Sequence, residues 1–369
     1  MKKIMVVAGA RPNFMKIAPL MREFRKVRRQ VEVLLVHTGQ HYDYQMSEVF
    51  FKDLDIPTPD IYLEVGSGSH AVQTAKIMLE FEKVALAHKP DCVIVVGDVN
   101  STVACSLVAT KLNIRMAHVE AGLRSFDRRM PEEINRLVTD AISDYLFVSE
   151  TSGMKNLKKE GVPAKKYFYV GNVMIDTLLA HLPKINRSRI LSALNLQPRG
   201  YCVLTLHRPS NVDSKEALEQ IAGILRQIPA QVKLVWPIHP RTKGKISEHK
   251  LDAVFQSLEN LILVEPQGYV DFVRLVKDAR FVLTDSGGIQ EETTFLKVPC
   301  LTMRENTERP VTITEGTNIL VGRDLKKISR SMRAILQGKV KQGKTPKFWD
   351  GKAAVRIVKI LLQELTAGK

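Results

Sequence analysis

The sequence predicts an α/β protein made of two Rossmann-like domains, each built on a parallel β-sheet. Short apolar segments alternate with longer helical segments along the chain, which is the pattern of consecutive βαβ units. A polar connecting stretch at 181–200, with prolines at 183 and 198, interrupts this alternation, and the alternation then starts afresh. The length of 369 residues, 44% of them hydrophobic, suits about two domains.

The hydrophobic periodicity gives the expected elements in order. The expected helices lie near 14–29, 70–88, 101–112, from 131, 214–228, 269–279 and 289–296. The expected strands are IMVVA (4–8), VEVLLV (31–36), CVIVV (92–96), IRMAHV (114–119), YLFV (145–148), YFYV (167–170), CVLTL (202–206), VKLVW (232–236), LILV (261–264), FVLT (281–284), PCLTM (299–303) and NILV (318–321). Parallel sheets bind ligands beyond the carboxyl ends of their strands, so we expect the substrate between the two domains.

The apolar segment at the N-terminus does not have the form of a signal peptide. Ile4–Ala10 is short and is followed at once by Arg11 and Pro12, so it is typical of a buried first strand. No window approaches the roughly 18–20 uninterrupted apolar residues of a membrane span. We therefore expect a cytoplasmic protein that does not enter a membrane.

The cysteines and histidines do not form a metal-binding pattern. The four cysteines lie mostly in apolar segments without CxxC spacing, which favours reduced thiols in the core. The closest histidines, His37 and His41, have no third ligand nearby in the sequence. No metal site is expected.

The formal charge of +16 raises the question of nucleic-acid binding. The densest basic run, Arg22–Arg29, has apolar residues every three to four positions, which is typical of the solvated face of an amphipathic helix. We expect no nucleic-acid partner, because the excess charge is spread over helical surfaces. A basic protein would still attract a dianionic substrate such as a nucleotide diphosphate sugar.

Two strand-to-helix turns could hold an anion. The first, Gly9–Lys16, offers a helix start with Arg11 and Lys16 nearby, but it lacks the GxGxxG and P-loop fingerprints and could be a plain turn. The second, Thr284–Glu292, combines Ser286, Gly287 and Gly288, whose backbone amides could approach a diphosphate. Glu292 lies about one turn into the expected helix, where it could reach ribose hydroxyls. A simple capping box is the alternative for this second turn.

Polar groups follow several expected strands. Asp98 and Glu120 end successive strands, and Glu132 stands with Glu133 at the start of the helix from Pro131. Each acid alone could be a cap or a dipole partner, but their convergence on one rim favours acid–base chemistry. In the C-terminal half, His207 and His239 each end a strand beside an arginine, which suits stabilisation of a leaving group.

Together these segments resemble the non-hydrolysing UDP-N-acetylglucosamine 2-epimerases. The similar motifs, in order, are GARPNFMKIAPL, GDVNST, HVEAGLRS, MPEEINR, GNVMIDTL, TLHRPSN, PQGYVDF, TDSGGIQEE and MRENTERP. The resemblance covers nearly the whole chain. It implies a GT-B fold with an active site in the interdomain cleft, an N-terminal domain of 1–175 plus 352–369, and a UDP-binding domain of 176–351.

The resemblance also implies roles for individual residues. Gln267 and Phe272 would contact the uracil, and Glu292 the ribose. Lys16, Asp98, Glu120 and Glu132 would face the sugar. The diphosphate would be surrounded by Ser286, Gly287, Gly288, Arg11, His207 and Arg309.

The implied reaction converts UDP-N-acetylglucosamine to UDP-N-acetylmannosamine, a precursor for surface polysaccharide. UDP would be eliminated to give 2-acetamidoglucal and then added back, with no metal and no nicotinamide cofactor. A homodimer is a family expectation. Relatives use a second UDP-N-acetylglucosamine as activator through residues near Gln40 and His41, both present here, although HRPSN replaces the HRRE-type run of many relatives.

Three other hypotheses about the function compete with that of a non-hydrolysing epimerase. A hydrolysing 2-epimerase, which releases N-acetylmannosamine, would share the fold. A retaining GT-B glycosyltransferase would need two glutamates eight positions apart, and Glu308 and Glu315 are seven apart. A nucleic-acid-binding protein would need stacking aromatic residues, which make up only 6% of the chain.

Overall fold

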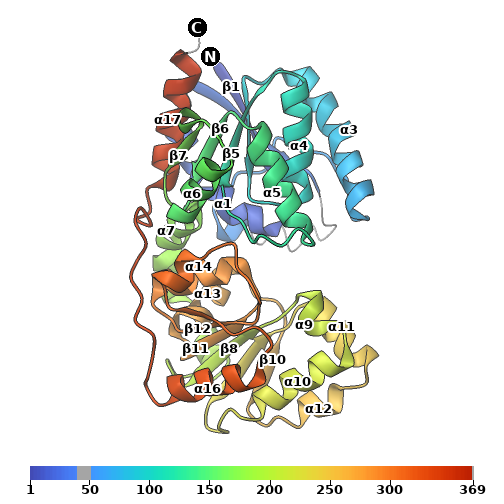
Figure 1. The fold of residues 1–369 in the computed structure, drawn as a ribbon, viewed down its shortest axis with the longest axis vertical. Helices are drawn as coiled ribbons and strands as arrows, with labels where there is room; N and C mark the ends of the chain where they lie inside the picture. The colour runs from blue at the N-terminus through green and yellow to red at the C-terminus, as the bar shows by residue number, and fades with distance from the viewer. Residues whose placement is uncertain (40–50, 368–369) are drawn as a thin grey trace. The chain divides into compact units, whose positions relative to one another are not determined.

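In the computed structural model, which describes residues 1–39 and 51–367, the chain divides into two units, each with its own parallel sheet (Figure 1). Unit 1 comprises Met1–Ala180 and Lys347–Lys369, and unit 2 comprises His181–Pro346. The predicted α/β class with two parallel sheets is confirmed. The predicted domain limits, 1–175 with 352–369 and 176–351, stay a prediction, because compactness alone does not show which segment folds independently.

Unit 1 contains a seven-stranded sheet in the order β3-β2-β1-β4-β5-β6-β7, and every neighbouring pair is parallel. The central strand β4 is apolar and wholly buried, as expected for a strand covered by helices on both faces. The strands are β1 Lys2–Ala8, β2 Val31–His37, β3 Ile61–Tyr62, β4 Cys92–Val96, β5 Arg115–Ala121, β6 Tyr145–Val148 and β7 Tyr167–Tyr169.

The helices of unit 1 connect these strands and cover the sheet. Helices α3, α4 and α5 pack side by side, and α1 packs against the C-terminal helix α17 (Figure 1). The helices are α1 Arg11–Lys26, α3 His70–His88, α4 Asn100–Lys111, α5 Pro131–Ile142, α6 Thr151–Lys159 and α17 Ala353–Ala367, with a 3-10 turn at Ala164–Lys166. Helix α7, Val173–Arg187, begins in unit 1 and ends in unit 2.

Unit 2 contains a six-stranded parallel sheet in the order β10-β9-β8-β11-β12-β13. The strands are β8 Tyr201–Thr205, β9 Lys233–Pro237, β10 Leu261–Val264, β11 Phe281–Thr284, β12 Cys300–Thr302 and β13 Asn318–Leu320. The helices are α8 Ile190–Ala193, α9 Pro209–Val212, α10 Lys215–Leu225, α11 Pro240–Glu248, α12 Asp252–Gln256, α13 Tyr269–Asp278, α14 Gly287–Leu296, α15 Val311–Thr314 and α16 Leu325–Leu336. Trp236 and Phe255 lie in the larger of its apolar clusters.

The C-terminal segment is attached to unit 1 by specific hydrogen bonds. The Asp176 carboxylate accepts from the amides of Ala353 and Ala354, the first residues of α17, at 3.2 and 2.8 Å. The indole of Trp349 donates to the Ser149 carbonyl at 3.1 Å. Two of the first amides of α17 thus gain an acceptor from a residue far away in the chain.

The expected connecting stretch at 181–200 begins where the chain passes from unit 1 to unit 2, and its first part is helical, because α7 continues to Arg187 through Pro183. Proline has no amide hydrogen and removes one helical hydrogen bond. Ile175, Leu178 and Ile185 are fully buried along this helix, and their packing offsets that loss.

All four cysteines are buried free thiols, as predicted, and burial raises the pKa of each thiol.

Within residues 1–39 and 51–367, no helix has both the length and the apolar character needed to cross a membrane. In the same part of the chain, no group of three or more histidine, cysteine or acidic side chains is placed to hold a metal ion. Gln40 and His41 lie outside the described residues.

The environment of Asp176 makes the stability of unit 1 depend on pH. Burial raises the pKa of Asp176 from 3.8 to about 6, so the folded state holds this proton more tightly than the unfolded state. The resulting stabilisation is present below pH 3.8 and is lost as the pH rises through 6.

We expect Asp176→Asn, which is neutral throughout, to gain stability relative to the parent by up to about 3 kcal/mol between pH 4 and pH 7. Urea unfolding in a Trp236→Phe background measures this change, since Trp349 then reports on unit 1 alone. A stability difference between the two proteins that is constant with pH, or one that shifts in favour of the parent as the pH rises, would contradict a raised pKa of Asp176.

Candidate active site

In unit 1, the predicted sugar-facing residues follow the neighbouring strands β1, β4 and β5. Lys16 lies on α1, which follows β1, and its Nζ is 2.8 Å from Oε1 of Glu120. Both side chains are about nine-tenths buried or more, at 6% and 3% exposure. The structure therefore brings Lys16 and Glu120 together as a buried ion pair.

Gly97 makes room for this ion pair. Its φ is +68°, and a Cβ atom there would lie 2.6 Å from Nζ of Lys16. A larger residue would be strained and would displace the ammonium group. The glycine before Asp98 is thus required by the geometry on both counts.

Glu120 has an unusual backbone conformation. Its φ is +77°, and the pairing of β5 with β6 shifts register between Val119 and Ala121. A bulge of this kind redirects a side chain at the end of a strand, and such conformations concentrate at functional sites. The local strain at Glu120 supports its candidate role.

Asp98 is held by helix α5. Arg136 forms an ion pair with the Asp98 carboxylate, and Asn135 donates to the Asp98 carbonyl at 2.9 Å. The Asp98 side chain keeps 21% exposure, whereas Arg136 keeps 2%. Arg136 therefore fixes Asp98 from the protein side and leaves part of the carboxylate accessible.

The adjacent acids Glu132 and Glu133 have different environments. Glu133 is buried and accepts hydrogen bonds from Ser125, Phe126 and Arg136. Burial would raise the pKa of Glu133, but the bonds from Ser125 and Arg136 outweigh it and lower that pKa. Glu133 thus holds the loop after β5, and Glu132 remains half-buried in the first turn of α5.

His118, which the sequence analysis did not single out, lies at the centre of a buried charge cluster. Its Nδ1 is 2.7 Å from Asp140, and its Nε2 is 2.7 Å from the Gly97 carbonyl. Burial would raise the pKa of Asp140, but His118 and Arg124 hold it below its usual range, so Asp140 is a carboxylate. A carboxylate and a carbonyl can only accept, so both ring nitrogens of His118 face hydrogen-bond acceptors.

In unit 2, Asp285 organises the loop after β8. Its buried carboxylate accepts from the amides of His207 and Arg208 at 3.1 and 2.9 Å, and from the Asn211 side chain at 2.9 Å. It also lies 2.9 Å from Nδ1 of His207. Burial would raise the pKa of Asp285, but the bond from His207 contributes most to lowering it.

The role of Asp285 as an orienting group for His207 was not predicted from the sequence. The structure places the two residues together because β8 and β11 are neighbours in the sheet. His207 keeps 45% side-chain exposure, so its ring can reach a ligand while Asp285 fixes its direction. The ring of His239 lies 6.0 Å from that of His207.

The predicted phosphate-binding turn is the start of α14. Ser286 is its N-cap residue, and Gly287 and Gly288 follow. A Cβ on Gly287 would lie 2.8 Å from Nη1 of Arg309, so the guanidinium is close to the helix start. Arg309 is 5% exposed and forms ion pairs with Glu291 and Glu308.

Three of the remaining predicted nucleotide contacts belong to unit 2. Gln267 and Phe272 are half-buried, and Phe272 packs against an apolar cluster. Glu292 is 4% exposed, and burial together with the charge of Glu291 raises the pKa of Glu292 to about 8. Arg11 is the first residue of α1 in unit 1.

Comparison with known proteins supplies further evidence. The family model described as UDP-N-acetylglucosamine 2-epimerase matches residues 25–362. The UDP-N-acetylglucosamine 2-epimerase of Methanocaldococcus jannaschii is 44% identical over 364 residues, covering 97% of this chain and 98% of that protein. The UDP-2,3-diacetamido-2,3-dideoxy-D-glucuronate 2-epimerase of Pseudomonas aeruginosa is 41% identical over 363 residues, covering 97% and 99%.

Solved structures agree with these sequence matches. The crystal structure of the M. jannaschii UDP-GlcNAc 2-epimerase in complex with UDP-GlcNAc and UDP gives a TM-score of 0.91 at 43% identity. That match covers 98% of this chain and 99% of the other.

Each unit has a parallel sheet. Unit 1 carries carboxylates at the ends of two neighbouring strands, and unit 2 carries a glycine-rich helix start. Together these features define a GT-B-like enzyme. The chain belongs to the UDP-N-acetylglucosamine 2-epimerase family, whose members are isomerases. The predicted family and fold are confirmed.

The Lys16–Glu120 pair gives a stability test of the unit 1 site. Lys16→Met leaves a buried carboxylate without its cation, and we expect a loss of about 3–5 kcal/mol in the free energy of unfolding. Lys83→Met, which breaks the exposed Lys83–Glu80 pair, serves as the matched control and should cost less than about 1 kcal/mol. Urea unfolding in the Trp236→Phe background measures the loss for each variant. Equal losses would show that burial does not make the Lys16–Glu120 pair more important for stability than an exposed pair.

Proposed function

We propose that this protein interconverts UDP-N-acetylglucosamine and UDP-N-acetylmannosamine by inverting C2 of the sugar without net hydrolysis. The proton on C2 is not next to a carbonyl, so a base alone cannot readily remove it. Loss of UDP in the same stage solves this problem. A carboxylate takes the C2 proton, the C1–C2 double bond forms, and the C1–O bond breaks with its electron pair on UDP.

Return of UDP completes the reaction. Protonation of the 2-acetamidoglucal on the opposite face of C2, with re-addition of UDP at C1, gives the other epimer. Proton transfer on two faces favours more than one acid–base group. We assign this chemistry to Asp98, Glu120 and Glu132, with Lys16 facing the sugar.

The roles proposed for unit 2 concern the nucleotide. His207, oriented by Asp285, stabilises the charge of the departing diphosphate, together with the amides at Ser286, Gly287 and Gly288. Arg11 and Arg309 also surround the diphosphate. Gln267 and Phe272 contact the uracil, and Glu292 contacts the ribose.

The observation that carries the proposal is the pair of carboxylates at the ends of neighbouring strands. Asp98 follows β4 and is paired with Arg136, and Glu120 ends β5 and is paired with Lys16. These residues stand in motifs similar to those of the family that the chain belongs to. We further propose that the protein is a cytoplasmic homodimer and that its product is a precursor of surface polysaccharide. These points are supported by the family alone.

A second substrate has specific support. The P. aeruginosa relative named for UDP-2,3-diacetamido-2,3-dideoxy-D-glucuronate is 41% identical to this chain, close to the 44% of the M. jannaschii enzyme. Inversion at C2 is common to both names. The two sugars differ at C3 and C6, so a direct comparison of substrates decides between them.

Proton NMR in deuterated water tests the reaction. With UDP-N-acetylglucosamine we expect a mixture with UDP-N-acetylmannosamine, deuterium at C2 and no accumulating UDP. Free N-acetylmannosamine with UDP would indicate a hydrolysing enzyme instead. Turnover of UDP-2,3-diacetamido-2,3-dideoxy-D-glucuronate, with none of UDP-N-acetylglucosamine, would mean that the former is the substrate.

Variants connect the reaction to the site. Asp98→Asn and Glu120→Gln should each lower kcat by roughly 10²–10⁴, because each removes an acid–base group. Glu82→Gln, on the exposed face of α3, is the matched control and should keep parental activity. Parental rates in Asp98→Asn and Glu120→Gln would remove both residues from the chemistry.

A further inference from the structure

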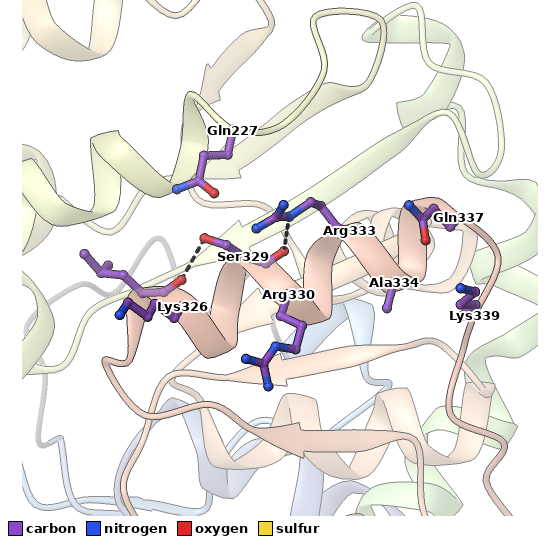
Figure 2. Close-up of a pocket in the computed structure, with 9 residues that line it drawn as sticks. Gln227, Lys326, Ser329, Arg330, Arg333, Ala334, Gln337 and Lys339 are labelled. Atoms are coloured by element: carbon purple, nitrogen blue, oxygen red, sulfur yellow. Dashed lines mark hydrogen bonds between the residues drawn. The ribbon is translucent and has the colours of Figure 1, made fainter.

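Two basic grooves lie on unit 2 away from the residues discussed above. One, of about 700 Å³, runs along α16 and is lined by Lys326, Arg330 and Arg333, which Figure 2 shows projecting from that helix. All three come from the outer side of a single amphipathic helix whose other side buries Ile328 and Met332. A solvated helix face explains this groove, and it carries no proposal.

The second groove, of about 670 Å³, has a different origin. Its cations come from separate segments, each placed just before a strand of the sheet or after α16. Arg199 precedes β8, Arg280 precedes β11 and Lys297 precedes β12, and these three strands are neighbours. Because the strands are parallel, the groove lies at the amino edge of the sheet, and the start of α14 lies at the carboxyl edge.

A fourth cation, Lys341, comes from the segment after α16, and no acidic side chain of the described chain lines this groove. Three of these four cations donate to main-chain carbonyls: Arg199 to Ala279 at 2.7 Å, Arg280 to Leu336 at 2.6 Å and Lys341 to Asn318 at 2.9 Å. Elsewhere in the protein, buried cations such as Lys16, Arg124 and Arg136 are paired with carboxylates.

Four like charges held around one cavity without a counter-charge repel one another. Burial also lowers the pKa of the half-buried Lys341 and that of the more exposed Lys297. A bound anion would relieve both effects.

We propose that this groove is a second anion site, specific for a small organic polyphosphate of nucleotide size. Its volume lies within the roughly 300–1,000 Å³ of small-molecule pockets. The four cations suit two or more phosphate groups. Pro299, Ile335 and Val340 supply an apolar wall for the base or another apolar portion.

Isothermal titration calorimetry with ADP tests the inference. UDP is left out, because it belongs to the same ligand class and would occupy the groove itself, and the groove variants separate binding here from binding at the proposed catalytic nucleotide site. We expect one ADP per chain, bound at least tenfold more weakly by Arg199→Gln/Lys297→Gln. Lys326→Gln/Arg330→Gln removes the same charge from the α16 groove and should bind ADP as the parent does. Epimerase activity, measured in parallel, tests the proposed function separately.

Three results would overturn the inference. ADP could fail to bind at millimolar concentration, or all three proteins could bind it equally. Inorganic pyrophosphate could bind as tightly as ADP, which would make the apolar wall irrelevant and reduce the groove to a site for inorganic anions.

Discussion

The arrangement of the unit 1 site depends on the buried His118–Asp140 pair. His118 reaches from β5 to the Gly97 carbonyl at the end of β4, beside Asp98. Asp140, on α5, also accepts from the Gly122 amide at 2.9 Å and from Arg124 at 2.6 Å. One charge cluster therefore joins two strand ends, the loop after β5 and the helix that carries Arg136.

Both units use a buried carboxylate to orient groups at strand ends. Asp140 holds His118 in unit 1, and Asp285 holds His207 in unit 2. His118 is fully buried and positions the backbone, whereas His207 is half-exposed and available to a ligand. In each case, burial of the carboxylate is tolerated because several donors converge on it.

The sequence predicted the features that depend on local pattern. Alternation of apolar and helical segments gave the order of elements, and strand ends located Asp98, Glu120, His207 and the start of α14. The family resemblance, not the strand pattern, implied that Lys16 and Glu120 face the same sugar, and the structure pairs them although they are far apart in the chain. The predicted strand-end positions follow from one rule, that the carboxyl ends of parallel strands share an edge of the sheet.

The features that the sequence could not supply depend on packing between distant segments. Pro183 was expected in a connecting stretch, but it lies inside α7, where burial of Ile175 and Ile185 outweighs one missing hydrogen bond. Arg136 and Asp285 belong to the motifs named above, but only the fold shows that they pair with Asp98 and His207. The positive φ of Glu120 likewise has no signal in the residue type.

The most direct test is the hydrogen bonding of the His118 ring, measured by nitrogen-15 NMR of protein with labelled histidine and assigned with a His118→Gln variant. We predict that both ring nitrogens of His118 are hydrogen-bonded, one to Asp140 and one to the Gly97 carbonyl, and that Asp140→Asn weakens the first bond. A His118 ring nitrogen without such a bond in the parent protein would contradict the cluster on which the positions of Asp98 and Glu120 depend.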